Sequence, residues 1–279
     1  MKQIYQILKM IRKIFPIIFL IIISCTNKII SLENGCDFPE SNLVPGGHIK
    51  FISNDYQESF QGIQCLNKDK TVTLIYPIPL ELEDQRISIS DDVFIIQEKK
   101  FRESRIVIED QNFIKLSPES RKRIREEQVR LNALYAVDSD QMNLNWPMVQ
   151  PVSGYITSRF GLRRFINGSP RNRHLGLDIA NKEGTKIIAP LNGRVIFKGN
   201  LFYKGNNIIL DHGNGFLSSY SHLNEIFVEE KEYLEKGQLM GTVGSSGRVT
   251  GPHLHFEIFI GGKRIDPEGL INELQSLDY

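Results

Sequence analysis

Residues 251–260 read Gly-Pro-His-Leu-His-Phe-Glu-Ile-Phe-Ile, and this stretch decides what the second half of the chain can be. From His253 onward, polar and apolar side chains alternate and aromatic and β-branched residues are frequent, which predicts a strand over 253–260. Alternate side chains of a strand lie on the same face of its sheet. The stretch therefore predicts a strand that presents His253 and His255 on one face.

Two other segments of this half carry similar side chains. His174 and Asp178 lie four residues apart in the sequence RHLGLD, and both can approach one point if the segment is extended or bends at Gly176. His222 lies in the sequence SYSHL. Four of the six histidines of the chain thus fall in three short segments. Packing alone does not explain this concentration.

These residue types point to a hydrolytic zinc site. Zinc binds neutral imidazole nitrogens and carboxylate oxygens, and catalytic zinc sites use three protein ligands and leave one position for water. The five candidates exceed that need by two. Unligated histidines suit the proton transfers of hydrolysis and the stabilisation of an oxyanion. The spacing does not tell which three residues bind the metal.

The two remaining histidines are expected to have structural roles. His212 directly precedes the sequence Gly-Asn-Gly, and its Asn-Gly pair is a strong hairpin signal, so His212 is expected to serve the turn. The alternative that it lines the groove around the predicted zinc site stays open. His48 stands alone beside a Gly-Gly turn and is expected at the surface or in packing.

Composition excludes some partners. The chain has 34 Lys and Arg against 33 Asp and Glu, so no overall field attracts a polyanion, and nucleic acid is not an expected partner. A hydrophobic content of 41% and a charged content of 24% are typical of a globular protein. A length of 279 residues predicts two folded units and a tail.

Residues 1–24 are predicted to be a lipoprotein signal peptide. A basic segment precedes the ten apolar residues Ile14–Ile23, which is short for a membrane span. The following Ser24-Cys25 resembles the end of a bacterial lipobox, which implies cleavage before Cys25 and lipid attachment to it. An uncleaved anchor or a plain signal peptide are the alternatives. In each case the folded part works outside the cytoplasm. The lipoprotein interpretation places it in the periplasm, anchored by lipid to the inner or the outer membrane.

Residues 25–42 are then expected to be a tether from the membrane. The remaining cysteines, Cys36 and Cys65, could form one disulfide in an oxidising compartment, although a reduced pair is an open alternative.

The fold class is predicted to be mainly β, with a small N-terminal β-sandwich over 43–112. Short runs with period-two alternation recur there between turn signals. These runs lie at 48–52, 71–76, 86–89 and 104–108.

A helical linker is predicted over 113–145. Ser117 can cap its helix, Pro118 suits the first helical position and Glu119 complements the helix dipole. Its apolar stripe consists of Ile124, Leu131, Leu134 and Tyr135.

Residues 146–279 are predicted to form an antiparallel β domain without long helices. Glycines become frequent, and apolar strand-like runs recur to the end of the chain. The runs lie at 186–189, 193–197, 207–210, 216–220 and 253–260.

The second domain resembles the lysostaphin/LytM-type zinc metallopeptidases, which are bacterial peptidoglycan endopeptidases. The resemblance runs from about Trp146 to Pro267, and the N-terminal region more weakly resembles the β-sandwich that precedes this peptidase in some exported members. The matching motifs are GYITSRFGLR (154–163), PRNRHLGLDIA (170–180), GNLFYKGN (199–206), SYSHL (219–223), GSSGRVTGP (244–252) and DP (266–267).

The resemblance implies roles that the spacing left open. His174, Asp178 and His255 correspond to the ligands of one zinc ion per chain. His222 and His253 correspond to the catalytic pair that activates water and stabilises the transition state.

Three further residues correspond to the substrate groove of the relatives. Tyr203 and Asn206 fall in a loop that flanks the groove, and Arg163 lies near its opening. Tyr203 either helps to hold the oxyanion or only packs.

The implied function is zinc-dependent hydrolysis of the peptide cross-bridges of peptidoglycan, with stem peptides as substrate and a lipid anchor to the membrane. The alternative is a non-catalytic module of the same fold that binds the wall or activates an amidase. Such relatives typically lack some zinc ligands, whereas this chain has all of them.

Overall fold

In the computed structural model of the 279-residue chain, the structure describes residues 38–82, 84–107, 116–137, 139 and 144–271. The predictions on residues 1–37, including the signal peptide, Cys25 and Cys36, lie outside this part. Within the described residues, no helix combines the length and the apolar character that a membrane crossing requires. Cys65 is disulfide-bonded.

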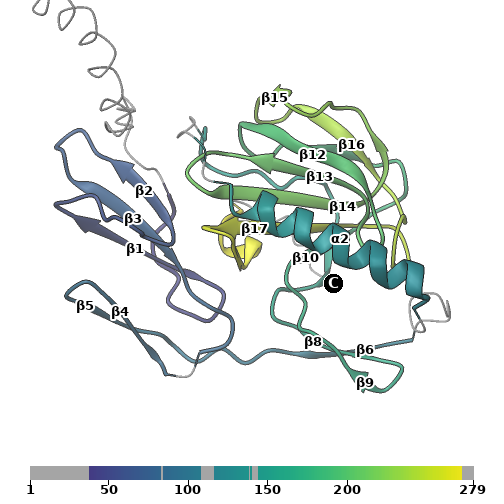
Figure 1. Cartoon of the computed structure of the whole chain (residues 1–279), viewed down its shortest axis with the longest axis horizontal. Helices are drawn as coiled ribbons and strands as arrows, with labels where there is room; N and C mark the ends of the chain where they lie inside the picture. Colours follow the sequence, from purple (N-terminus) through teal and green to yellow (C-terminus); the bar gives the residue numbers. More distant parts are fainter. Residues whose placement is uncertain (1–37, 83, 108–115, 138, 140–143, 272–279) are drawn as a thin grey trace, which may run out of the picture. The chain divides into compact units, whose positions relative to one another are not determined.

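The N-terminal part contains two small antiparallel sheets (Figure 1). In the first sheet β3 (Val72–Pro77) lies between β1 (His48–Ser53) and β2 (Ile63–Leu66). The second sheet is a hairpin of β4 (Arg86–Ile89) and β5 (Asp92–Ile95). Ile49 and Ile78 pack with Ile89 and Ile96 of the hairpin segment in one hydrophobic cluster. Both sheets therefore contribute to one hydrophobic cluster.

His48 lies within this part and is 2% exposed. Its Nε2 lies 3.2 Å from the backbone carbonyl of Pro39, and its ring packs edge-on against Phe38. His48 is therefore a packing residue.

The strand predicted at 104–108 has a different partner from the other N-terminal strands. β6 (Glu103–Ile106) pairs in parallel with β8 (Arg163–Ile166), which pairs in turn with β9 (Ser169–Pro170). Ser104 lies opposite Arg164 in this ladder. An alternating run indicates a strand but does not identify its neighbour, so this pairing was not expected. The predicted domain boundaries themselves stay a prediction.

The one α-helix among the described residues is α2 (Pro118–Tyr135). The Ser117 hydroxyl accepts a hydrogen bond from the Ser120 N–H at 3.1 Å, which confirms the predicted cap. Leu131 and Tyr135 of the predicted stripe are buried. The Tyr135 ring stacks on Phe259 with their centroids 4.0 Å apart. The helix therefore packs against the large sheet of the C-terminal part (Figure 1).

That large sheet is antiparallel, which confirms the mainly β class. Its main path runs β15-β12-β13-β14-β17-β10-β7, while β16 joins β11 to β14 and β18 pairs with β17. Its strands are β7 (Tyr155–Ser158), β10 (Leu177–Ala180), β11 (Lys186–Ile188), β12 (Gly193–Leu201), β13 (Gly205–Asp211), β14 (Phe216–Ile226), β15 (Tyr233–Leu234), β16 (Leu239–Val243), β17 (His253–Ile260) and β18 (Lys263–Ile265). A short 3-10 helix, η2 (Pro267–Gly269), follows.

The two faces of β17 have different environments. Leu254, Phe256 and Ile258 are fully buried in the main hydrophobic core. The opposite face carries His253, His255, Glu257 and Phe259 in sequence. Tyr135 of α2 covers the end of this face at Phe259. The histidine end of the same face is left for the site.

The predicted hairpin at 212–215 joins β13 to β14, which pair antiparallel. His212 is fully buried, with Nδ1 donating to the Asn192 carbonyl at 2.7 Å and Nε2 lying 2.7 Å from the Ser218 hydroxyl. Asn214 adopts a φ of 52°, as such a turn requires. His212 therefore serves the hairpin, as expected.

Burial lowers the pKa of His212 from 6.5 to about 4. The unfolded chain therefore takes up this proton first as the pH falls. The neutral side chain stabilises the fold fully above pH 6.5, and this contribution is lost as the pH falls towards 4. Over that window we expect the unfolding free energy of the wild type to fall by about 3 kcal/mol more than that of His212→Gln. Denaturant titrations at several pH values measure the difference, and parallel curves for both chains would contradict it.

Candidate metal centre

Two neighbouring strands bring a carboxylate and an imidazole together. β10 and β17 are antiparallel, with Asp178 opposite His255 and Ala180 opposite His253. Directly opposed side chains share a face and have Cβ atoms ~4.5–5.5 Å apart. Asp178 Oδ1 accordingly lies 2.7 Å from His255 Nδ1. The strand register thus places Asp178 and His255 side by side.

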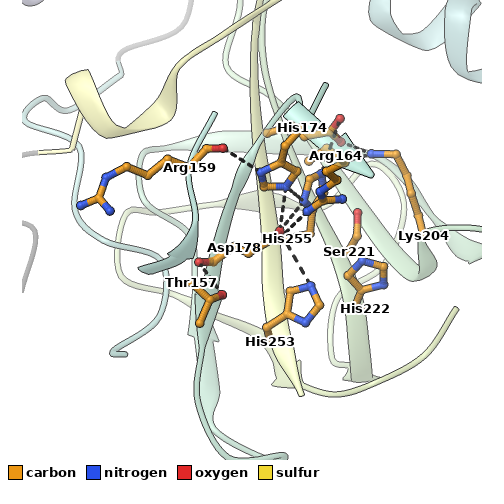
Figure 2. A network of polar contacts seen from close by, with 12 residues as sticks. Thr157, Arg159, Arg164, His174, Asp178, Lys204, Ser221, His222, His253 and His255 are labelled. Carbon is orange, nitrogen blue, oxygen red and sulfur yellow. Dashed lines mark hydrogen bonds and ion pairs between the residues drawn. The ribbon is translucent and has the colours of Figure 1, made fainter. Parts of the chain in front are cut away.

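His174 approaches the same point from the loop before β10. Its backbone is held in place by hydrogen bonds to Leu162 and Gly161. A side chain at Gly176 would lie 2.7 Å from the His255 ring, so only glycine lets the loop pass this closely over His255. His174 Nε2 lies 3.0 Å from Asp178 Oδ1 and 3.0 Å from His255 Nδ1. We call His174, Asp178 and His255 the metal triad (Figure 2).

The chemistry of the metal triad fits a cation. His174 Nδ1 donates to the Arg159 carbonyl at 3.0 Å, so the proton of the neutral ring is on Nδ1 and Nε2 carries a lone pair. This lone pair faces a carboxylate oxygen at 3.0 Å. Two acceptors at that distance repel unless a proton or a cation lies between them. Two imidazole nitrogens and one carboxylate oxygen are also a common ligand set for catalytic zinc.

The charge states suit metal binding. Burial raises the pKa of Asp178, but hydrogen bonds with His174 and His255, formed when a proton lies between the groups, and the positive charge of these rings outweigh this effect and hold the pKa well below its usual value. Burial lowers the pKa of His255 well below its usual value. An anionic carboxylate and a neutral imidazole are the forms that bind metals.

Asp178 is also oriented from outside the triad. The Arg164 guanidinium donates to Asp178 Oδ2 at 2.8 Å, which leaves Oδ1 directed at the two histidines. Arg164 comes from β8, so the small sheet β6-β8-β9 supports the carboxylate. Such partners hold a metal ligand in its binding orientation.

His222 reaches the site through a bulge in β14. In a regular strand Ser221, opposite His255, would share the site face, and His222 would point to the core. However, the pairing with β13 skips a residue here, and His222 has a φ of 68°. A positive φ is uncommon for a residue other than glycine, and bulges often redirect a side chain next to an active site.

The bulge brings His222 beside His253, with their ring centroids 4.9 Å apart (Figure 2). His222 Nδ1 donates to the Ser246 carbonyl at 2.8 Å, and His253 Nδ1 donates to the Gly251 carbonyl at 2.8 Å. In their neutral forms both rings therefore keep a lone pair on Nε2. His253 Nε2 lies 3.8 Å from Asp178 Oδ1, beside the triad. Burial, together with the nearby His253, lowers the pKa of His222 to about 3.

Asp178, His255, Arg164, His222 and His253 line one cavity of about 590 Å³, which we call the site cavity. His174 is buried and does not line it. Of the three predicted substrate-binding residues, only Tyr203 lines it. The Asn206 amide instead donates to the backbone carbonyls of Leu223 and Asn224 and so supports the loop. Arg163 is exposed and does not line the site cavity.

Sequence reasoning missed three cationic residues that line the site cavity, namely Arg164, Lys204 and Arg248. Arg164 directly follows the predicted Arg163 and projects from the other face of β8. Lys204 directly follows the predicted Tyr203 and pairs with Glu257, which also pairs with Arg264 at 2.8 Å. For Arg164 and Lys204, the predictions thus named the neighbouring residue of the same segment.

Comparison with known sequences assigns the second half of the chain to a family. Residues 172–267 match peptidase family M23, and the chain therefore contains an M23 (LytM-type) peptidase domain. A crystal structure of a Pseudomonas aeruginosa protein assigned to peptidase M23 has a TM-score of 0.64 and 27% identity. It covers 84% of this chain and 96% of that chain, so the likeness extends well beyond the peptidase region.

The curated relatives have two kinds of name. The peptidoglycan DD-endopeptidase ShyA of Vibrio cholerae is 37% identical over 112 residues, which are 40% of this chain and 26% of ShyA. The murein hydrolase activator NlpD of Escherichia coli is 36% identical over 118 residues, which are 42% of this chain and 29% of NlpD. This chain thus spans little more than a quarter of the length of these relatives.

The metal triad predicts how the chain responds to loss of metal. We expect the purified chain to contain zinc and EDTA to lower its melting temperature by roughly 5–10 °C, because a bound ion stabilises only the folded state. His174→Ala should lose the zinc, since it removes a ligand. His222→Ala should retain it, since it removes an imidazole of the same cavity outside the triad. Elemental mass spectrometry and thermal melts measure both properties, and equal zinc content in the two variants would contradict the assignment.

Proposed function

We propose that the chain is a zinc-dependent endopeptidase that hydrolyses the peptide cross-bridges of bacterial peptidoglycan. One observation carries this proposal: the unligated pair His222 and His253 lines the same cavity as Asp178 and His255 of the metal triad. A site that only stores a metal needs no such pair. Hydrolysis needs one, because protons must move to and from the reacting atoms.

His174 Nε2, Asp178 Oδ1 and His255 Nδ1 would hold one zinc ion. Bound there, zinc would acidify water and polarise the scissile carbonyl. The protein groups around it fix the ligands, because the Arg159 carbonyl and the Arg164 guanidinium hold His174 and Asp178 in their binding orientations.

His253 and His222 would carry the protons. His253 Nε2, directed towards the triad, is placed to accept a proton from the attacking water. A ring that has accepted this proton carries an N–H at Nε2, and in that form the pair would stabilise the developing oxyanion and return the proton to the leaving amine. The backbone carbonyls of Ser246 and Gly251 hold both rings in the tautomer with Nε2 free. Neither ring has to turn between these steps.

The substrate is proposed from the family and from the relatives. ShyA is named as a peptidoglycan DD-endopeptidase, and the match to peptidase family M23 includes the metal triad, His222 and His253. We propose stem peptides of peptidoglycan as the substrate. Export, attachment to the membrane through a lipidated Cys25, and a tether over residues 25–42 belong to the same proposal, because the substrate lies outside the cytoplasm.

An activator role is the second candidate, favoured by the similarity to NlpD. An activator works through a partner protein and does not need a complete set of catalytic side chains. In this chain the triad and both additional histidines are present and converge. We therefore favour the enzyme.

Digestion of purified sacculi tests the proposal. The zinc-loaded wild type should release soluble peptides and cleave cross-linked muropeptides into monomers. His222→Ala and His253→Ala should be slower by about 10²–10⁴-fold while retaining zinc, because a general acid or base contributes on this scale.

Lys186→Gln is the matched control, since Lys186 is exposed and does not line the site cavity. It should digest at the wild-type rate. If the zinc-loaded wild type does not digest sacculi but an added amidase digests them faster in its presence, the proposed enzymatic role is wrong and the activator role takes its place.

A further inference from the structure

The cations of the site cavity differ in whether they have a carboxylate partner. Arg164 is paired with Asp178 and Lys204 with Glu257. Among the described residues that line the cavity, Asp178 is the only carboxylate, and it is held by Arg164. No ion pair of the described residues includes Arg248. Its charged neighbours are Arg164 and Arg171, which repel it.

The Arg248 guanidinium is nevertheless held in place. It lies over the Tyr203 ring, 4.3 Å from the centroid. The backbone N–H of Arg248 donates to the Tyr203 carbonyl at 3.0 Å and so anchors the residue that carries the guanidinium. Gly247 beside it has a φ of 78°, and a side chain there would lie 2.4 Å from the backbone of Gly205. The loop is therefore fixed. A guanidinium that stacks on a ring keeps its in-plane N–H donors free for a planar partner.

Burial lowers the pKa of Arg248, so the protein environment opposes its charge. A partly buried cation without a counter-ion is costly, and an anionic ligand would offset this cost. A carboxylate matches the fork of N–H donors in geometry and charge. Stem peptides of peptidoglycan carry free carboxylates on side chains and at the chain end.

The position of Arg248 ties such a ligand to the reacting groups. Residues 246–253 form one short segment that holds both catalytic candidates: the Ser246 carbonyl accepts from His222, and His253 ends the segment. A substrate group held at Arg248 would therefore have a fixed position relative to both rings.

We propose that Arg248 binds a free carboxylate of the substrate peptide and so makes the enzyme selective for anionic stem peptides. This inference rests on the proposed function. Arg248 acts here as a specificity-determining residue: it contacts the substrate away from the scissile bond.

The test uses the zinc-loaded full chain and three synthetic cross-linked stem peptides that share one sequence. One peptide has all carboxylates free, the second has the C-terminal carboxylate amidated, and the third has the side-chain carboxylate amidated. In the wild type, at least one amidation should lower kcat/KM by ten- to a hundred-fold, on the order expected for a hydrogen-bonded ion pair. The peptide affected identifies the carboxylate.

In Arg248→Gln this preference should shrink to less than about three-fold, while Arg248→Lys should keep part of it because the charge remains. Lys186→Gln is the control for a lost positive charge and should keep the full preference. Equal cleavage of all three peptides by the wild type, or an unchanged preference in Arg248→Gln, would overturn the inference.

A binding measurement distinguishes a failure of the Arg248 inference from a failure of the proposed function. Calorimetry measures the Kd of each peptide for the zinc-loaded His222→Ala chain, with and without Arg248→Gln. If no peptide is cleaved by the wild type, the proposed function fails, and the carboxylate dependence of Kd still decides the role of Arg248. A Kd that is insensitive to amidation would overturn that role.

Discussion

The site depends on one constraint, the register of β10 against β17. Because Asp178 lies opposite His255, Leu177 and Ile179 lie opposite Phe256 and Leu254 on the other face. These four apolar side chains are fully buried in the main core. A slip by one residue would move them to the site face and Asp178 into the core. Hydrophobic packing on one face thus fixes the geometry of the metal triad on the other.

The polar face of the sheet is organised by pairing each carboxylate with cations. Arg164 holds Asp178, and Lys204 with Arg264 holds Glu257 two residues beyond His255. Buried carboxylates without such partners would be costly. The pairing leaves the oxygen Asp178 Oδ1 directed at the histidines. It also distinguishes Arg248, whose guanidinium lines the cavity without an acidic partner among the described residues.

Local patterns allowed much of the fold to be predicted from the sequence. The capped helix, the Asn-Gly hairpin and the strand-like runs of β1, β13 and β17 depend on neighbouring residues, and each lies where it was predicted. That His253 and His255 share a face could likewise be predicted, because this depends only on their spacing within one strand. Pairing between distant strands was not readable, so β6 lies beside β8 unexpectedly. The bulge that redirects His222 depends on contacts between distant strands. The same is true of which arginine of β8, Arg163 or Arg164, faces the site cavity.

A crystal structure of the zinc-loaded chain, with anomalous data collected on both sides of the zinc absorption edge, tests the central claim most directly. The account predicts one zinc peak about 2.0–2.2 Å from His174 Nε2, Asp178 Oδ1 and His255 Nδ1, with His222 and His253 outside the ligand set. A peak bound by His222 or His253 in place of a triad residue, or no peak between these three atoms, would contradict it.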